Sequence, residues 1–190
     1  FASPYNQQPL NQGADVVIHS STKYLGGHSD LIGGAIIVKD NEELANKIKF
    51  LQNAIGSIPS PFDCYMLIRS IKTLGVRMDR HNNNGMEIAN YLSKHPKIKK
   101  VFYPGLESDP NHLNAKKQMT GFGGIVSLEL NSDLNGTKKF LENIEIFTLA
   151  ESLGGVESLI EHPAIMTHSS IDIKIREELG ILDNLVRLSI

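Results

Sequence analysis

One stretch of the chain, built around a single lysine, carries the most information about fold and chemistry: Ser20-Ser21-Thr22-Lys23-Tyr24-Leu25-Gly26-Gly27-His28-Ser29-Asp30. It follows the apolar run 15–19, which predicts a buried strand. A lysine placed directly after a strand has an anchored stem, and an amine partly withdrawn from water reacts readily with a carbonyl group. The glycines at 26 and 27 let a ligand approach the backbone closely. The stretch therefore predicts a site around Lys23, with the hydroxyls of Ser20 and Thr22 available to bind an anion such as phosphate.

Taken from the residues alone, Lys23 has two other interpretations. A lysine in a glycine-rich loop is more often a solvated surface residue than a reactive one, and that interpretation stays open at this point. The spacing Ser20-x-x-Lys23 also matches the nucleophile motif of serine β-lactamases and penicillin-binding proteins. That motif opens a helix and needs a Ser-Asp-Asn partner, whereas here glycines follow at once and no Ser-Asp-Asn occurs. The sequence therefore disfavours acyl transfer.

Composition limits the class of protein. The 190 residues suit one domain or slightly more, and 19 basic against 21 acidic residues give a net charge of -2, which disfavours nucleic-acid binding. Hydrophobic residues make up 41% of the chain without a run long enough for a membrane span, and no signal peptide opens it. Cys64 is the single cysteine, which excludes an internal disulfide and predicts a reducing, cytoplasmic location. The first residue is not Met and the last run, 185–190, is strand-like, so we expect a fragment of a longer chain.

Hydrophobic spacing outside the lysine stretch predicts a mixed α/β protein. Apolar runs predict strands over 31–38, 97–103, 124–130, 144–149 and 185–190. Helical spacing predicts helices over 42–53 (capped by Asn41), 62–93, 112–119, 138–142 and 172–179. Gly75 and Gly85 weaken the long helix and predict a bend or break there. We expect two domains, residues 1–75 and 76–190, that meet inside this helix.

Four further runs of sequence, read together with the lysine stretch, resemble one enzyme family in order along nearly the whole chain. These are the runs 59–65 with 72–74, 147–159, 163–168 and 185–189. The resemblance is to the Cys/Met-metabolism pyridoxal-phosphate (PLP) enzymes, which include cystathionine γ-lyases, γ-synthases and β-lyases and methionine γ-lyases. It implies a fold-type I PLP-dependent enzyme. Residues 1–75 would be the C-terminal part of the large PLP domain, and residues 76–190 the smaller C-terminal α/β domain, truncated at its end.

The resemblance also implies roles for individual residues. Lys23 would form the Schiff base with the cofactor and later move the substrate's Cα proton, while Ser20 and Thr22 would bind the cofactor phosphate. Arg187 would bind the substrate α-carboxylate, a task that suits a planar guanidinium. The remaining implied substrate-binding residues are Ser152, which helps to place that carboxylate, Glu151, which faces the distal amino group of cystathionine, and Thr167.

The activity implied is γ-elimination of cystathionine to cysteine, 2-oxobutyrate and ammonia. Methionine γ-lyases lack the acid at the position of Glu151, which argues against them. A cystathionine γ-synthase, in which cysteine replaces the γ-substituent of an activated homoserine, is the alternative. A third possibility is an inactive fragment, because in the family the aspartate that pairs with the pyridine nitrogen lies before the position of Phe1. Complete members form homotetramers, and a closing helix follows the position of Ile190.

Several other residues have plainer interpretations. His19, His28 and His168 lack the spacing of a metal site, so no metal is expected. Cys64 is expected to be a small core residue. Glu157 and Glu161 fit either the rim of a site or a structural role, and spacing alone does not separate the two. For Arg187, the alternative to substrate binding is a salt bridge at a strand end.

Overall fold

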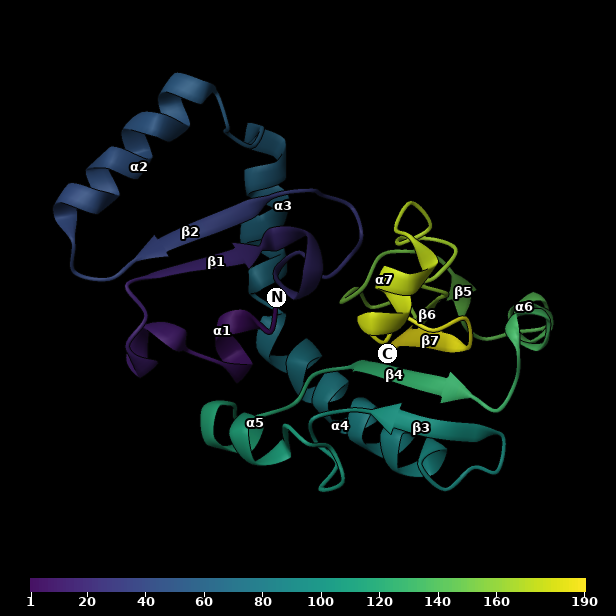
Figure 1. Cartoon of the computed structure of the whole chain (residues 1–190). Coiled ribbons are helices and arrows are strands. Elements are labelled where there is room, and N and C mark those ends of the chain that lie inside the picture. The colour runs from purple at the N-terminus through teal and green to yellow at the C-terminus, as the bar shows by residue number, and fades with distance from the viewer.

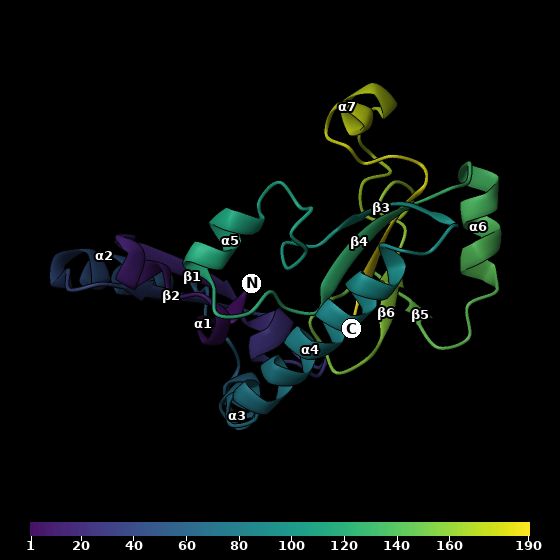
Figure 2. The same cartoon turned by 90° about the horizontal axis from the view of Figure 1, so that it is seen from below.

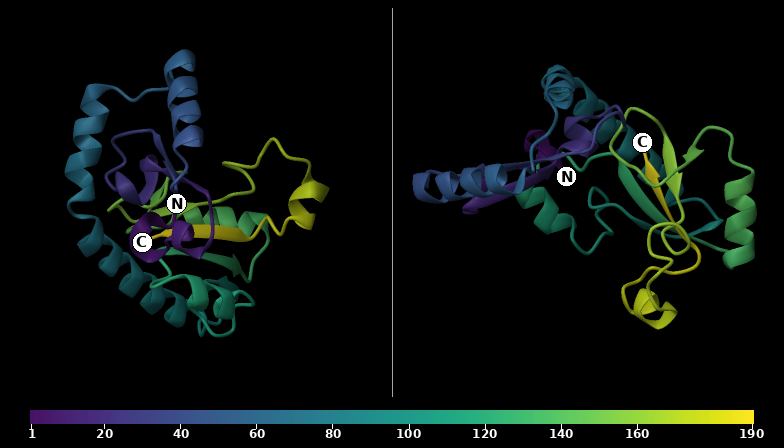
Figure 3. Two further views of the ribbon diagram at one scale, coloured as in Figure 1. Left: turned by 90° about the vertical axis from the view of Figure 1, so that its left-hand side faces the viewer. Right: turned by 90° about the horizontal axis from the view of Figure 1, so that it is seen from above.

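Two separate β-sheets organise the chain in a computed structural model that describes residues 1–190 (Figure 1). The smaller sheet has two strands and the larger has five. Helices α3 (Pro61–Ile71) and α4 (Leu74–Leu92) run from the small sheet to the large one (Figure 2). With α2 (Glu42–Ile55) they form an arc along one side of the molecule, which the left-hand view of Figure 3 shows. None of the helices combines the length and hydropathy needed to cross a bilayer.

The small sheet is an antiparallel pair on either side of the lysine stretch. Strand β1 (Val16–Ser20) pairs with β2 (Gly34–Val38), and a short helical turn, η2 (Ser21–Leu25), follows β1 directly. The strands were predicted to be buried, and that prediction is wrong for this chain, because Ile18 is 71% exposed and Ile36 is 52% exposed. The physical reason is that no second sheet layer lies over the pair. Helix α1 (Ser3–Asn6) and the turn η1 (Pro9–Gln12), which precede it, were not predicted.

The predicted long helix breaks at Lys72 and Thr73 and not at a glycine. Helix α3 ends at Ile71, and the carbonyl of Ser70 accepts hydrogen bonds from both the backbone N–H and the hydroxyl of Thr73. Those contacts replace the regular helical bond at this carbonyl, so the chain turns before α4 begins. Gly75 and Gly85 both lie inside α4. The Asn41 cap of α2 is confirmed, since its side chain accepts from the N–H of Leu44 at 2.9 Å.

The large sheet has the order β3-β4-β7-β6-β5, so its middle strand is the last of the five in the sequence. Its strands are β3 (Ile98–Phe102), β4 (Ile125–Leu130), β5 (Thr148–Leu149), β6 (Leu159–Glu161) and β7 (Leu185–Ser189). All neighbours are antiparallel except β5 and β6. The predictions of strands over 97–103, 124–130 and 185–190 are confirmed, whereas β6 was not predicted. Helices α5 (His112–Gln118), α6 (Leu134–Glu142) and α7 (Ile173–Glu178) complete the fold.

The core lies in two clusters. The larger one fills one side of the five-stranded sheet and includes Val126, Leu128 and Val186, all at most 2% exposed. The smaller one joins the turn η2 to helix α4 through four residues: Tyr24, Leu25, Leu74 and Met78. This second cluster matters for function because it fixes the turn that carries Lys23.

Candidate functional site

The lysine lies on the turn η2, immediately after β1. The turn has the wide winding of a π-helix, and the N–H of Gly26 donates to the carbonyl of Ser21 at 2.8 Å. Lys23 interrupts the turn, with φ −90° and ψ −131°. Its side chain is half-buried and forms neither a hydrogen bond nor an ion pair with any group of the chain. The Lys23 amine is therefore free to react.

The two hydroxyls predicted to bind phosphate differ in their contacts. The Thr22 hydroxyl accepts from the N–H of Gly33 at 3.0 Å and lies 3.3 Å from the carbonyl of the same residue. It ties the turn to the start of β2. The Ser20 hydroxyl has no hydrogen-bond partner in the chain and is half-buried. The Ser20 hydroxyl can therefore give all of its hydrogen bonds to a ligand, whereas the Thr22 hydroxyl already bonds Gly33 and has fewer left.

A buried arginine on α4, which the sequence did not single out, supports the turn from behind. Arg77 is 9% exposed and donates to the carbonyl of Tyr24 at 2.7 Å, the carbonyl of Ser70 at 3.0 Å and the hydroxyl of Thr73 at 3.1 Å. No carboxylate pairs with it. Burial lowers the pKa of this guanidinium from its usual value. At Gly27, which has φ +67°, an added Cβ would lie 2.0 Å from Nη1 of the arginine. The guanidinium of Arg77 therefore lies so close to the backbone at position 27 that only glycine fits.

Tyr24 links the turn to the large sheet. Its hydroxyl accepts from the N–H of Gly124 at 2.8 Å, and burial raises the pKa of this phenol to about 12. Its ring lies 4.9 Å from the ring of His81 and 5.8 Å from the ring of Phe1. His81 in turn contacts the carbonyl of Ile190 through Nδ1, and burial lowers the pKa of its imidazole. Tyr24, the residue after Lys23, thus holds the turn beside Phe1 and, through His81, beside Ile190.

The predicted carboxylate-binding residue, Arg187, lies on the middle strand of the large sheet. Its Nη2 donates to the carbonyls of Glu151 at 2.6 Å and Ser152 at 3.0 Å, and it lies 2.5 Å from the carboxylate of Glu161. Burial lowers the pKa of Arg187, and Glu161 partly offsets this effect. Nη1 forms no hydrogen bond. Arg187 therefore forms the salt bridge that was the alternative to substrate binding, but this salt bridge leaves Nη1 of the guanidinium unused.

The other predicted substrate residues surround this guanidinium in different ways. Thr167 donates its hydroxyl proton to Glu161 and lies 2.8 Å from Nδ1 of His168. Glu151 and Ser152 contribute backbone carbonyls, while their side chains form no hydrogen bond. The Glu151 side chain is exposed. Sequence reasoning left Glu161 open between a rim and a structural position, yet it is the buried centre of this group, at 1% exposed.

One loop connects the lysine turn to the arginine strand. Gly154 donates its N–H to the hydroxyl of Ser189 on β7 at 2.9 Å. At the same residue, φ is +77°, and an added Cβ would lie 3.0 Å from the nitrogen of Tyr24 and 3.3 Å from the carbonyl carbon of Lys23. Two residues on, the N–H of Val156 donates to the carbonyl of Gly27 at 3.0 Å. Segments more than 150 residues apart in sequence, at 23 and 187, are therefore held against the same short loop.

All 190 residues of the chain match the family of Cys/Met metabolism PLP-dependent enzymes. The chain belongs to this family. A cystathionine beta-lyase of Coxiella burnetii is 60% identical over the whole chain, and a cystathionine gamma-lyase of Dictyostelium discoideum is 54% identical, each match covering 49% of the relative. A crystal structure of a cystathionine gamma synthase from Xanthomonas oryzae, in complex with aminoacrylate and cysteine, superposes with a TM-score of 0.95 at 45% identity, covering 99% of this chain and 48% of that one.

These matches confirm the predicted family and the α/β fold of PLP-dependent enzymes. The chain spans about half the length of the curated relatives it matches. The names of the relatives cover β-lyase, γ-lyase and γ-synthase activities, so the family membership establishes the cofactor class and the cystathionine lyase and synthase group, and leaves the exact reaction open.

The residues present fit the family cofactor. PLP offers an aldehyde and a phosphate, which call for a free amine and for hydrogen-bond donors close to it. The unpartnered amine of Lys23 and the unpartnered hydroxyl of Ser20 supply those two groups three residues apart. No group of the chain competes for either of them.

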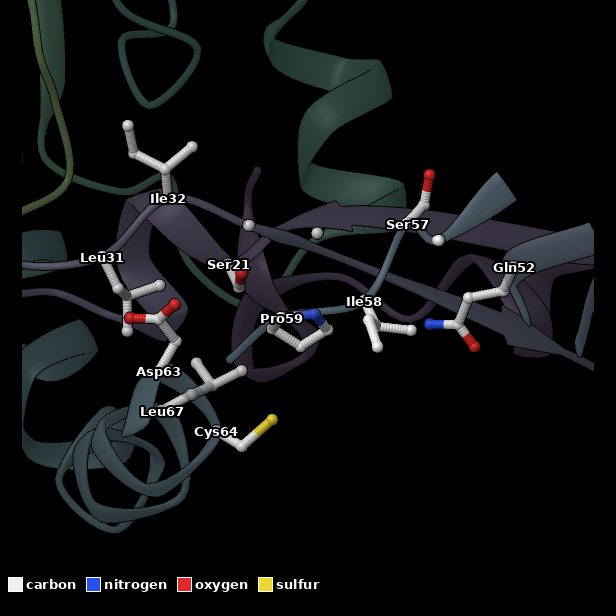
Figure 4. A pocket seen from close by; sticks show the side chains of 13 residues that line it. Ser21, Leu31, Ile32, Gln52, Ser57, Ile58, Pro59, Asp63, Cys64 and Leu67 are labelled. Atoms are coloured by element: carbon white, nitrogen blue, oxygen red, sulfur yellow. The ribbon is translucent and has the colours of Figure 1, made fainter. Parts of the chain in front are cut away.

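A separate cavity lies between the turn and helix α3 (Figure 4). It has a volume of about 280 Å³ and includes Ser21 and Leu31, with Asp63, Cys64 and Leu67 of α3 along one side. Lys23 does not line it. Cys64 was predicted to be a core residue, which is wrong, because its side chain is only half-buried where α3 borders this cavity.

Proposed function

We propose that the complete protein carrying this chain cleaves the C–S bond of cystathionine by γ-elimination, giving cysteine, 2-oxobutyrate and ammonia. The observation that supports it best is the loop 151–156, which touches both the turn of Lys23 and the strand of Arg187. An amine without a partner can accept the Cα proton, and a guanidinium group with an unused amino group can donate to the α-carboxylate of the same amino acid.

Each predicted residue has a task in this proposal. Lys23 holds the cofactor covalently and then carries the proton removed from Cα. Ser20 and Thr22 bind the phosphate. Arg187 binds the α-carboxylate through Nη1, with Ser152 and Thr167 beside it. When bound, PLP supplies the electron sink that makes loss of the Cα proton feasible.

Glu151 supports the choice of cystathionine as substrate. Its carboxylate is exposed and unpaired, and its backbone carbonyl contacts the Arg187 guanidinium. An amino acid bound at Arg187 would therefore have an acidic group close to it. Cystathionine carries a second ammonium group at the far end, which this carboxylate would attract.

Two other reactions have support from the relatives. The β-lyase of Coxiella burnetii favours β-elimination, which would release homocysteine, pyruvate and ammonia from the same substrate. The γ-synthase of Xanthomonas oryzae favours replacement of the γ-substituent of an activated homoserine by cysteine. The keto acid formed from cystathionine distinguishes the two lyase reactions. Assembly into a homotetramer, a cytoplasmic location and the domain division at 75/76 remain predictions.

The first experiment tests the cofactor lysine. The complete protein, loaded with PLP, is reduced with borohydride and compared with Lys23→Ala and with Lys47→Ala, which replaces an exposed lysine of α2 that has no side-chain partner. We expect wild type and Lys47→Ala to carry the cofactor covalently on one peptide, and Lys23→Ala to lose both the visible absorbance band and the label. A covalent label that persists in Lys23→Ala would contradict the assignment.

A further inference from the structure

Glu161 is a buried acidic residue to which the proposed chemistry gives no role. It lies on β6, directly opposite Arg187 on β7, and is 1% exposed. One carboxylate oxygen lies 2.5 Å from Nη2 of Arg187, and the other accepts the hydroxyl proton of Thr167. A single carboxylate thus joins two residues that are predicted to contact the substrate.

The contacts of Arg187 show what this carboxylate does to the guanidinium. Nη2 is shared among Glu161 and the carbonyls of Glu151 and Ser152, which come from the loop 151–156. A planar group held by acceptors on two different segments has little freedom to rotate. Immobilising a long side chain on binding weakens the affinity, and here that ordering precedes the ligand.

Two effects of Glu161 on a carboxylate ligand oppose each other. Its negative charge partly neutralises Arg187 and weakens the attraction for a second carboxylate. Its ion pair with Nη2 keeps the guanidinium in one orientation, with Nη1 unused. The side chains of Arg187 and Glu161 are 20% and 1% exposed, so solvent screens the charge effect only weakly. We expect the positioning effect to dominate because the ion pair occupies Nη2 and leaves Nη1 for the ligand.

We infer that Glu161 is a positioning residue for amino-acid binding, which orients Arg187 and Thr167 so that Nη1 of Arg187 meets the α-carboxylate of the substrate. This inference rests on the proposed function. It adds a requirement that the proposed function lacks, namely that a residue with no contact to the ligand controls recognition of one end of the ligand. Removing Glu161 should therefore weaken the binding of ligands that carry a carboxylate and spare ligands that do not.

Two probes separate these cases in the PLP-loaded complete protein. L-Norvaline carries the α-carboxylate but no leaving group, and n-butylamine is the same molecule without the carboxylate. Both are titrated by the change in cofactor absorbance. The variants are Glu161→Ala, the conservative Glu161→Gln, and a matched control, Glu129→Ala, which removes another buried glutamate of the same sheet, paired with Lys99 at 3.0 Å.

We expect Glu161→Ala to bind L-norvaline about tenfold or more weakly and n-butylamine within about twofold of wild type, because only the carboxylate contact is lost. Glu161→Gln, which keeps two polar atoms at the same place, should stay within about threefold for both probes. Glu129→Ala should leave both affinities unchanged. If Glu161→Ala does not fold, Glu161→Asp keeps the charge but draws the carboxylate back by one methylene from Arg187 and Thr167, and a loss confined to L-norvaline is again expected.

Three results would overturn the inference. Equal losses for both probes would indicate general damage to the site, and tighter binding of L-norvaline by Glu161→Ala would show that charge neutralisation dominates. An unchanged affinity for L-norvaline in Glu161→Ala would show that Arg187 needs no such support. A wild-type protein that binds PLP on Lys23 but does not bind L-norvaline would instead contradict the proposed function, and the inference with it.

Discussion

Replacing the buried arginine behind the lysine turn should loosen that turn by a measurable amount. Arg77→Met keeps the aliphatic stem and removes the hydrogen bonds to the carbonyls of Tyr24 and Ser70, at 2.7 and 3.0 Å, together with the one to the hydroxyl of Thr73, at 3.1 Å. A hydrogen bond from a charged donor contributes about 1.5–3 kcal/mol, so the two to backbone carbonyls alone contribute about 3–6 kcal/mol. Removing a buried, unpaired charge recovers part of that loss. We expect a net destabilisation of about 2–4 kcal/mol.

The assay is equilibrium unfolding in urea, followed by circular dichroism, with Arg80→Met as the control. Arg80 lies on the same helix but is exposed and has no side-chain partner, so its replacement should change the free energy of unfolding by less than about 0.5 kcal/mol. Gly27→Ala provides an independent route to the same defect, because its Cβ would lie 2.0 Å from Nη1 of Arg77. The two changes should then destabilise the double variant by less than the sum of their separate effects.

Two results would refute this reasoning. Arg77→Met as stable as Arg80→Met would show that the carbonyls of the turn find other partners. Full additivity with Gly27→Ala would show that the glycine matters only for its φ of +67° and not for the approach of the guanidinium.

The remaining predictions concern the connecting loop and the pH dependence of stability. Gly154→Ala should cost about 1–3 kcal/mol, measured by urea unfolding, because φ is +77° and its Cβ would lie 3.0 Å from the nitrogen of Tyr24; a cost below about 0.5 kcal/mol would contradict it. Burial lowers the pKa of His81 in the folded state, so the unfolded chain binds more protons and stability should fall as pH drops through about 6.5. His81→Asn should show a smaller loss of stability than wild type between about pH 7.5 and about pH 5.5. A residual slope should remain from His19, whose pKa burial also lowers. A slope equal to that of wild type would contradict the prediction.

Much of the fold could be predicted because its elements carry local signals. The cap of Asn41 and the apolar alternation over Ile125–Leu130 each act within one element, and both are confirmed. The exposure of the small sheet could not be predicted, because apolar runs show what a strand can bury and not what lies beside it. The break after α3 depends on two contacts with the carbonyl of Ser70, one from Thr73 between the helices and one from Arg77 on α4.

The site divides in the same way. Lys23 and Arg187 lie in runs that resemble the family, and both are held against the loop 151–156. Glu161 gave no signal that separates a rim position from a structural one, because β6 has only three residues and the partner of Glu161 on β7 is 26 positions away in sequence. Arg77 gave none either, since a lone arginine in a helical pattern usually faces solvent. Their roles depend on contacts between distant segments, which a single sequence does not specify.

The strand order has a consequence for how this region is made. Ribosomes release a chain from its N-terminus, so β3 and β4 emerge first and β5 and β6 follow, while the strand that joins the two pairs is the last of the five. Until β7 arrives, the edges of β4 and β6 have no partner and are open to wrong pairings. Arg187 arrives on that final strand, so closing the sheet and completing the carboxylate-binding group are the same event. A nascent chain that stalls before residue 185 would therefore contain the lysine turn but not a complete five-stranded sheet. We expect such a chain to depend on chaperones.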